Sequence, residues 1–278
     1  MKFDPDAVRA FEHAGWQQAA GEYDATFALA SAPFAEALLD AAGVAEGMQL
    51  LDVGSGTGVV TAAASRRGAL PTGVDFSSAM LAQARRTYPR LRFDEGDAEA
   101  LPYPDRSFDA VVSNFGIHHL PGPGKGIAEA LRVLRPGRRV AVTSWAVPAE
   151  NIAWQLLYDA IRAHGDMQAA TTPPPGGNLG TTEAMLRLIQ SSGFTDCRAE
   201  IVRREWLVAE PRDIVVALAR GTVRTAALIG AQPAAALPAI EAAVAKAAAR
   251  YRTGSGFAVP IVAILASGVN PPASPDPA

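Results

Sequence analysis

The sequence predicts an α/β protein whose centre is a doubly wound, mostly parallel sheet of about seven strands, with the last strand antiparallel. Two observations predict this fold class. Short apolar stretches alternate with helical stretches from Gln49 onward, and the connections between them are short. Parallel strands need crossovers to join them, and the helical stretches supply those crossovers. With 278 residues, of which 49% are hydrophobic, the chain can bury a core of this kind.

The predicted elements follow from apolar runs and from the residues that interrupt them. The first strand, over 49–53, is an apolar run that ends at a glycine cluster, and the helix over 57–68 stops at Gly68. The last strand candidate contains Pro260, which indicates an edge position or a bulge. The other predicted strands cover 71–75, 91–93, 108–113, 139–145, 197–208 and 256–267, and the other predicted helices cover 78–88, 126–134, 152–164 and 182–192.

Three segments lie outside this alternation. Residues 1–46 are helical by pattern and are expected to form an N-terminal helical lid before one α/β domain over 47–269. Two helical insertions are expected within that domain, at 147–180, which contains a Pro- and Gly-rich loop, and at the Ala-rich 211–253. The proline-rich residues 270–278 are expected to be a disordered tail.

Composition and charge exclude several classes of protein. The chain has 25 Lys and Arg against 28 Asp and Glu, and this balance predicts no surface for nucleic-acid phosphates. Cys197 is the only cysteine, which excludes an intrachain disulfide and a multi-cysteine metal site. The N-terminus has no apolar signal-peptide core, and no apolar stretch approaches the ~20 residues of a membrane span. We therefore expect a soluble, cytoplasmic protein, and the sequence carries no signal for its oligomeric state.

The stretch LLDVGSGTG at 50–58 is the most informative segment. It is a strand that runs into a glycine turn and then into a helix. Glycines let the backbone approach a ligand closely, and a helix N-terminus offers unpaired N–H groups to polar or anionic atoms. A tight turn without a ligand can carry the same pattern, so a binding site needs a second element.

That second element is Asp75, at the end of the next strand (TGVD). An acidic residue at this position can accept hydrogen bonds from both hydroxyls of a ribose, so the two elements together indicate a nucleoside. A dinucleotide fingerprint would need Gly or Ala where Val59 stands. Asp52, just before the turn, would repel a pyrophosphate but suits a cationic ligand, and S-adenosylmethionine carries a sulfonium and an ammonium.

Four motifs follow one another along the chain: LLDVGSGTG (50–58), TGVDFSSAML (72–81), GDAEALPYPDRSFDAVVSNFGIHHL (96–120) and EALRVLRPGRRVAVTSWA (129–146). In this order they resemble the class I S-adenosylmethionine-dependent methyltransferases, and within them the group that includes the ubiquinone/menaquinone-type methyltransferases. The resemblance is dense from Leu50 to Ala146 and loose in the flanks. It implies a Rossmann-like fold and an enzyme with S-adenosyl-L-methionine as methyl donor, S-adenosyl-L-homocysteine as product and a small molecule as acceptor. Ser55 departs from the family, which often has cysteine there.

The resemblance also implies a set of cofactor-binding residues, several of which lie at carboxyl ends of predicted strands, where open α/β sheets bind ligands. Phe76 and Met80 are expected beside the adenine, with simple core packing as the alternative for both. The set comprises Asp52, Gly54, Ser55, Gly56 and Gly58 on the methionine and ribose portion, Asp75 on the ribose hydroxyls, Phe76, Met80, Asp97 and Ala98 around the adenine, and Asn114 and Phe115 at the methyl end.

Two residues are candidates for acid–base catalysis, His119 and Tyr23. A neutral imidazole accepts a proton near pH 7, and His118 and His119 follow the fourth strand, although this HHL triplet also occurs in the family as a structural element. The resemblance further implies a helical N-terminal lid, from which His13, Trp16 and Tyr23 are expected to fold over the cofactor. Adjacent histidines on a regular element are expected to point apart, and no Cys or acidic cluster joins them, so no metal site is expected.

These features predict methyl transfer by in-line displacement to an O, N or C atom of a small, fairly apolar molecule. The methyl donor is already activated, so positioning and exclusion of water suffice and no catalytic triad is needed. The segments outside the common core, 1–46, 147–180 and 211–253, are expected to select the acceptor. Two alternatives stay open: a non-catalytic nucleoside-binding interaction or regulatory module, and an NAD-linked oxidoreductase, which Val59 weakens.

Overall fold

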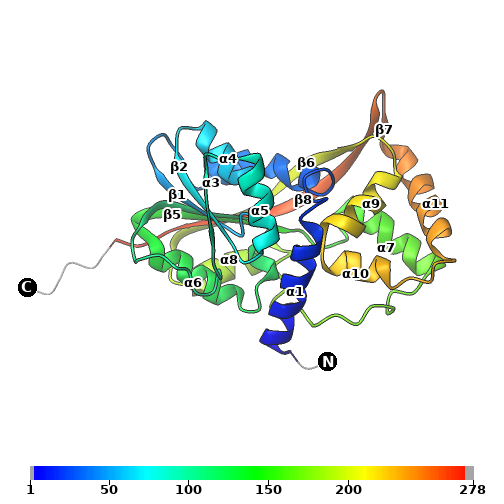
Figure 1. Ribbon diagram of the computed structural model, residues 1–278, viewed down its shortest axis with the longest axis horizontal. Coiled ribbons are helices and arrows are strands. Elements are labelled where there is room, and N and C mark those ends of the chain that lie inside the picture. Colours follow the sequence, from blue (N-terminus) through cyan, green and yellow to red (C-terminus); the bar gives the residue numbers. More distant parts are fainter. Residues whose placement is uncertain (1–2, 273–278) are drawn as a thin grey trace, which may run out of the picture.

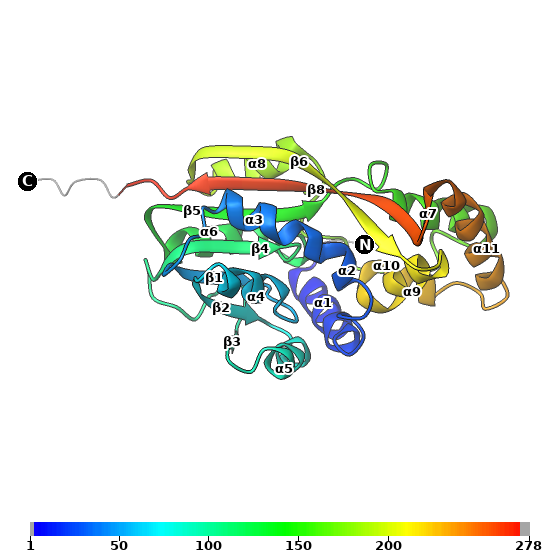
Figure 2. The ribbon, with the colours of Figure 1, turned by 90° about the horizontal axis from the view of Figure 1, so that it is seen from above.

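The computed structural model describes residues 3–272, and its centre is one mixed sheet (Figures 1 and 2). Across the sheet the strands follow the order β3-β2-β1-β4-β5-β8-β6, and the short β7 pairs with β8. Strands β1 to β5 pair in parallel, whereas β8 is antiparallel to β5 and β6. The predicted fold class, with its antiparallel last strand, is confirmed. The strands are β1 (Gln49–Val53), β2 (Leu70–Asp75), β3 (Arg92–Glu95), β4 (Phe108–Asn114), β5 (Leu134–Trp145), β6 (Thr195–Val208), β7 (Arg252–Thr253) and β8 (Gly256–Val269).

Helices cover both faces of the sheet, as the burial of parallel strands requires. Leu50 of β1 faces one layer with Leu38 of α3 and Val60 of α4, and Leu51 faces the other layer with Ile127 of α6. This alternation follows from the two-residue period of a strand. The helix α5 packs against β2 and β3 at one edge. The covering helices are α3 (Ala35–Ala41), α4 (Val59–Arg66), α5 (Ser78–Thr87), α6 (Pro123–Val133) and α8 (Thr182–Ser191).

Four further helices gather at one end of the sheet, and we call them the helical unit (Figures 1 and 2). They come from the two expected insertions: α7 (Ile152–His164) packs on α11 (Leu237–Ala248), and α9 (Arg212–Gly221) packs on α10 (Arg224–Gly230) and α11. Within residues 3–272, none of the helices combines the length and the apolar character that crossing a membrane takes.

The N-terminal segment has two parts. Its first helix, α1 (Pro5–Ala19), lies between α5 and the helical unit in both ribbon views (Figures 1 and 2). The chain then passes through α2 (Ala28–Ser31) and a 3₁₀ turn over Ala32–Phe34 into α3, which packs on β4 and β5. Only the first part therefore lies outside the layers of the sheet.

Two boundaries differ from the prediction for local reasons. The helix predicted over 57–68 begins at Val59, because Gly58 precedes it in a left-handed conformation with φ +88°. Such a conformation favours glycine and cannot continue a right-handed helix. The strand predicted from residue 139 begins at Leu134, directly after α6, so it also includes Arg135, Pro136 and Gly137.

The last strand is longer than predicted. It continues to Val269, and residues 273–278 of the expected tail lie outside the described residues. Pro260 pairs with Glu205 of β6, whereas β5 joins β8 only from Ala263 onward. The prediction of an edge position for Pro260 is therefore confirmed on the β5 side, where its missing N–H removes no ladder hydrogen bond.

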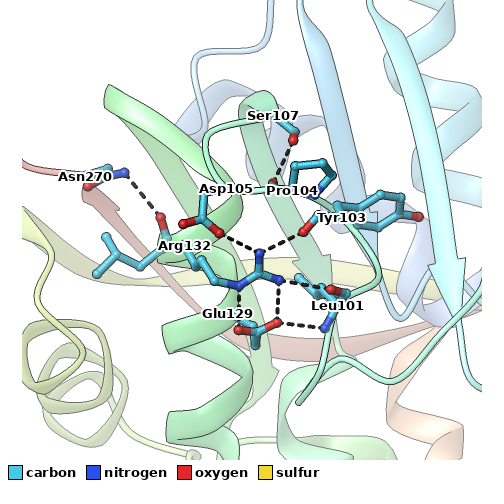
Figure 3. Close-up of polar contacts among 9 residues, drawn as sticks. Leu101, Tyr103, Pro104, Asp105, Ser107, Glu129, Arg132 and Asn270 are labelled. Carbon is cyan, nitrogen blue, oxygen red and sulfur yellow. Dashed lines mark hydrogen bonds and ion pairs between the residues drawn. The ribbon is translucent and has the colours of Figure 1, made fainter.

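The loop that leads into β4 is held by Arg132 of α6 (Figure 3). Its guanidinium donates to the carbonyl oxygens of Leu101 and Tyr103 at 2.9 and 2.7 Å. It also donates to the carboxylates of Glu129 and Asp105. These carboxylates raise the pKa of Arg132 above the already high value of an ordinary arginine, so the side chain stays charged. A planar group with five donors satisfies a loop that has no regular structure of its own.

Candidate functional site

A cavity lies at the carboxyl ends of β1, β2 and β4, beside α1, which is where open α/β sheets bind ligands. Trp16, expected over the cofactor, lines it. The sequence reasoning missed Arg9, Phe27, Ser113, Gly116 and Trp145, which also line the cavity. The predicted site residues in its wall are Tyr23, Gly54, Gly56, Asp75, Phe76, Met80, Asp97, Ala98, Asn114, Phe115 and His119.

Asp75 is oriented by the backbone on both sides. The N–H of Gly56 donates to its Oδ2 and the N–H of Ser77 to its Oδ1, each at 2.8 Å. Burial raises the pKa of Asp75, and these two hydrogen bonds offset part of the rise. Each oxygen keeps a further lone pair, and the side chain lines the cavity. Asp75 can therefore accept hydrogen bonds from two neighbouring hydroxyl groups.

The turn after β1 passes close to the end of β4. Gly54 has φ +68°, and a Cβ placed there would lie 3.3 Å from the Cα of Gly116. A Cβ on Gly116 would lie 2.7 Å from the Oγ of Ser113, which is buried and has no hydrogen-bond partner. A buried hydroxyl without a partner costs free energy, so it suits a ligand with a polar group at this point.

Three predicted cofactor residues, Asp52, Ser55 and Gly58, are not in the cavity wall. Asp52 lies behind the turn, 1% exposed, and accepts a hydrogen bond from the Thr61 hydroxyl at 2.6 Å. Burial raises its pKa to about 7. The Ser55 hydroxyl is buried, and a Cβ on Gly58 would strike Phe93 at 2.6 Å. Asp52 and Gly58 thus pack against other parts of the protein at the turn, and the binding role expected for the three residues stays a prediction.

The side of the cavity expected to hold the adenine is closed by α1. Arg9 donates to the carboxylate of Asp97 and, at 2.5 Å, to that of Glu99. Further along α1, the side-chain amide oxygen of Gln17 (Oε1) accepts hydrogen bonds from the Ser77 hydroxyl and the Ala79 N–H at 2.9 and 2.8 Å. These contacts join residues far apart in the sequence. No local pattern therefore marks Arg9 as the partner of Asp97 and Glu99.

The opposite end of the cavity is aromatic. Phe115 has φ +58°, a strained value for a residue with a Cβ, and its ring stacks on Trp145 at 3.8 Å. The Asn114 amide is held on both sides, by the Ser31 carbonyl and the Thr143 hydroxyl. The hydrogen bonds of Asn114 hold the backbone before Phe115, and the stacking on Trp145 fixes the direction of the Phe115 ring. Together these contacts compensate the strain.

The two histidines lie on a 3₁₀ turn over Ile117–His119. The expectation that they point apart is wrong, because their ring centroids are 4.1 Å apart. Burial lowers the pKa of His118 well below its usual range, so its ring stays neutral. His119 lines the cavity, and its Nδ1 lies 2.9 Å from a carboxylate oxygen of Glu12 on α1. Among residues 3–272, no cluster of three or more His, Cys, Asp or Glu is arranged to hold a metal ion.

Tyr23 lines the cavity as a neutral phenol. Its hydroxyl lies 3.2 Å from that of Ser31, and burial raises its pKa to about 12. A phenol of that pKa holds its proton at neutral pH, so it does not suit the role of a general base. His119 remains the better candidate for that role.

These features fit the cofactor that the motifs imply. Asp75 matches a ribose diol, the crossing of Gly54 and Gly116 allows close approach, and the Ser113 hydroxyl lacks a partner. The aromatic end suits a positively charged sulfur, because ring faces attract cations. The donor set therefore agrees with S-adenosylmethionine.

Sequence relatives agree with this geometry. Residues 51–142 match the family described as a methyltransferase domain. A demethylmenaquinone methyltransferase of Beutenbergia cavernae is 41% identical over 112 residues, which are 40% of this chain and 47% of that protein. The chain thus spans about half the length of the curated demethylmenaquinone methyltransferases it matches. An uncharacterised protein of Mycobacterium tuberculosis is 31% identical over 196 residues, 69% of each chain.

Solved structures share the fold. The YcgJ protein of Bacillus subtilis has a TM-score of 0.55 and 19% identity, covering 85% of this chain and 97% of its own. The phosphoethanolamine N-methyltransferase 2 of Haemonchus contortus, in complex with S-adenosylhomocysteine, has a TM-score of 0.54 and 21% identity over 86% of this chain and 52% of its own. The [4+2]-cyclase SpnF covers 97% of this chain and 94% of its own with a TM-score of 0.52. At these identities the likeness concerns the fold alone, and it includes a cyclase as well as methyltransferases.

The cofactor of the matched family is S-adenosylmethionine. The sheet order, the glycine turn with Asp75, the match to a methyltransferase domain and the sequence relatives all lead to the same family. The chain belongs to the class I S-adenosylmethionine-dependent methyltransferases.

Proposed function

We propose that the protein transfers the methyl group of S-adenosylmethionine to an oxygen, nitrogen or carbon atom of a small, fairly apolar molecule that contains a flat ring. One observation carries the proposal: aromatic side chains that contact one another in series line the cavity. Flat rings pack well against such walls, and pockets for small molecules are mostly apolar with few polar groups. The aromatic wall consists of Trp16, Tyr23, Phe27, Phe115 and Trp145.

The relatives add support for a ring of the quinone type. Those that share 40–41% of their residues with this chain over the cofactor domain are named demethylmenaquinone methyltransferases. The match covers 40% of this chain and about half of each relative, so it does not extend over all the segments that would select the acceptor. We therefore take a quinone-like ring as the first class of acceptor to test.

When bound, S-adenosylmethionine supplies a methyl group that is already activated by a positively charged sulfur. The tasks of the protein are then to hold, to orient and to exclude water. Asp75 accepts hydrogen bonds from the sugar, and α1 covers the cavity as a lid. Phe115 and Trp145 orient the acceptor ring, and His119 accepts a proton where the acceptor atom carries one.

Calorimetry with S-adenosylmethionine, S-adenosylhomocysteine and NAD tests the cofactor, and a panel of hydroxylated quinones, phenols and amines tests the acceptor. We expect both adenosyl compounds to bind, NAD to give no heat, and a hydroxylated ring to be methylated. Binding of NAD alone would reject the proposal. Binding of the adenosyl compounds without turnover across the panel would favour a nucleoside-binding module instead.

A further inference from the structure

A buried carboxylate lies behind His119. Glu12, on the inner face of α1, is 1% exposed. One of its oxygens lies 2.9 Å from the Nδ1 of His119, and the other lies 2.8 Å from the Nε of Arg224 on α10. The three residues come from the N-terminal segment, the turn after β4 and the helical unit, so the fold brings them together over large separations in sequence.

The carboxylate is held in its charged form. Burial by itself would raise the pKa of Glu12, but the hydrogen bond with His119 and the charges of His119 and Arg224 outweigh it, and the pKa lies below its usual range. Arg224 is itself anchored, because its Nη1 donates to the Pro173 carbonyl at 2.6 Å. A buried carboxylate with two partners is costly to leave half satisfied, so each partner is constrained by the other.

The imidazole of His119 is fixed in position and in tautomer. A charged carboxylate only accepts hydrogen bonds, so the nitrogen that faces Glu12, Nδ1, has to carry a proton. Trp16 packs edge-on against the ring at 4.9 Å. No protein group within residues 3–272 bonds the other nitrogen, Nε2, and the ring lines the cavity. In the neutral ring the basic lone pair is therefore on Nε2.

We infer that Glu12 is a positioning residue that holds His119 with Nδ1 protonated and Nε2 basic, and that the acceptor is a molecule whose reacting atom carries an acidic proton, such as a ring hydroxyl. This inference rests on the proposed methyl transfer. In the step, the O–H bond of the acceptor breaks and its proton goes to Nε2, while the oxygen–methyl bond forms. The carbon–sulfur bond breaks and leaves its electron pair on sulfur. Glu12 stabilises the imidazolium that results, and Arg224 keeps Glu12 ionised.

Several other charged or titratable groups surround His119. Asp75 at the end of β2 interacts with it through charge, and His118 is its neighbour on the same turn. Asp75 lies in the cofactor region and His118 stays neutral, so neither replaces Glu12 as the partner of Nδ1. The tautomer of His119 is thus set from α1 rather than from its own element.

The substitution Glu12→Gln separates the two possible functions of Glu12. A glutamine has one acceptor oxygen, and Arg224 can only donate, so Arg224 takes that oxygen. The amide NH₂ then faces Nδ1, which becomes the lone-pair nitrogen, and the proton moves to Nε2. Glu22→Gln is the matched control, because Glu22 also belongs to the N-terminal segment and pairs with an arginine of the helical unit, Arg220, but is 53% exposed.

The first measurement is the ¹⁵N NMR spectrum of the His119 ring in the protein without ligands. We expect a protonated Nδ1 in the wild type and in Glu22→Gln, and a protonated Nε2 in Glu12→Gln. A neutral His119 ring that carries its proton on Nε2 instead of Nδ1 in the wild type would overturn the inference, whether or not the variant folds. Retention of S-adenosylhomocysteine binding within about threefold shows that the variant is folded.

The second measurement is turnover of a hydroxylated ring. Glu12→Gln should lower kcat about 100-fold or more with little change in KM, because a base is lost and not a binding contact. Glu12→Asp should restore part of the rate, and Glu22→Gln should leave it unchanged. A wild-type kcat in Glu12→Gln would refute the positioning role. Failure of the wild type to bind either adenosyl compound would instead count against the proposed function, and the NMR result would still decide the tautomer.

Discussion

At the scale of single residues, Asp75 is oriented before any ligand binds, since two backbone N–H groups hold its oxygens at 2.8 Å. We predict that Asp75→Ala weakens binding of S-adenosylhomocysteine by about 1–3 kcal/mol, the cost of hydrogen bonds that are no longer made. Calorimetry measures this directly. Asp159→Ala, at an exposed position in α7, serves as the control. An unchanged affinity in Asp75→Ala would mean that the ribose binds elsewhere.

Asp52 makes stability depend on pH. Burial raises its pKa to about 7, whereas an unfolded aspartate ionises near pH 4. Between these values the folded chain holds a proton that the unfolded chain has lost, so the stabilisation is complete below about pH 4 and is lost as the pH rises to about 7.

The substitution Asp52→Asn should remove that dependence. The free energy of unfolding of the variant, relative to the wild type, should rise by an amount on the order of 4 kcal/mol as the pH goes from about 4 to about 8. Urea unfolding at several pH values measures this difference. A variant whose curve runs parallel to that of the wild type would show that Asp52 is ionised throughout.

At the scale of elements, the turn between β1 and α4 has two glycines with different tasks. Both have positive φ, +54° at Gly56 and +88° at Gly58, but a Cβ on Gly56 meets nothing within 4 Å, whereas one on Gly58 would lie 2.6 Å from the ring of Phe93. Phe93 is 6% exposed and packs in a small cluster, so it cannot move aside freely.

Alanine at the two positions should therefore act differently. Gly58→Ala should lower the free energy of unfolding by about 2–4 kcal/mol, from the clash and the unfavourable φ together. Gly56→Ala should lose only about 1–2 kcal/mol of stability, from φ alone. Chemical denaturation of the two variants provides the comparison, and equal losses would contradict the assignment of Gly58 to packing.

At the scale of the whole molecule, the N-terminal segment packs against the helical unit through contacts that need small residues. A Cβ on Gly15 would lie 2.3 Å from Val223, and one on Gly221 would lie 2.3 Å from the Cβ of Phe27. Val223 is 4% exposed, so it has no free space to enter. The N-terminal segment and the helical unit therefore fit closely only with glycine at these points.

Gly15→Ala should loosen the packing of α1 against the helical unit. Alanine favours a helix over glycine, so any destabilisation comes from the clash with Val223, which we expect to cost about 1–3 kcal/mol. Amide hydrogen exchange should become faster in α1 and α10 and stay unchanged in β1 and β4. Gly21→Ala, whose Cβ meets nothing within 4 Å, is the control, and equal exchange in both variants would contradict the prediction.

The alternating sheet and helices, the glycine turn and Asp75 at the end of β2 were all predicted from the sequence, because each leaves a local pattern. Apolar period, turn glycines and strand ends are properties of a few neighbouring residues. The same local patterns could not separate residues that face the ligand from those that support the turn, and so Asp52, Ser55 and Gly58 were expected in the cavity wall and lie behind it.

The sequence by itself thus determined the fold class, the family and the strand ends at which the cavity lies. Only the tertiary structure decided which side chains close the cavity, because Glu12 and His119 are 107 positions apart and Arg9 and Asp97 are 88 apart. A pair of charges that meets across such a separation depends on how helices pack on the sheet. Packing is set by the whole chain at once, and no short segment carries its signature.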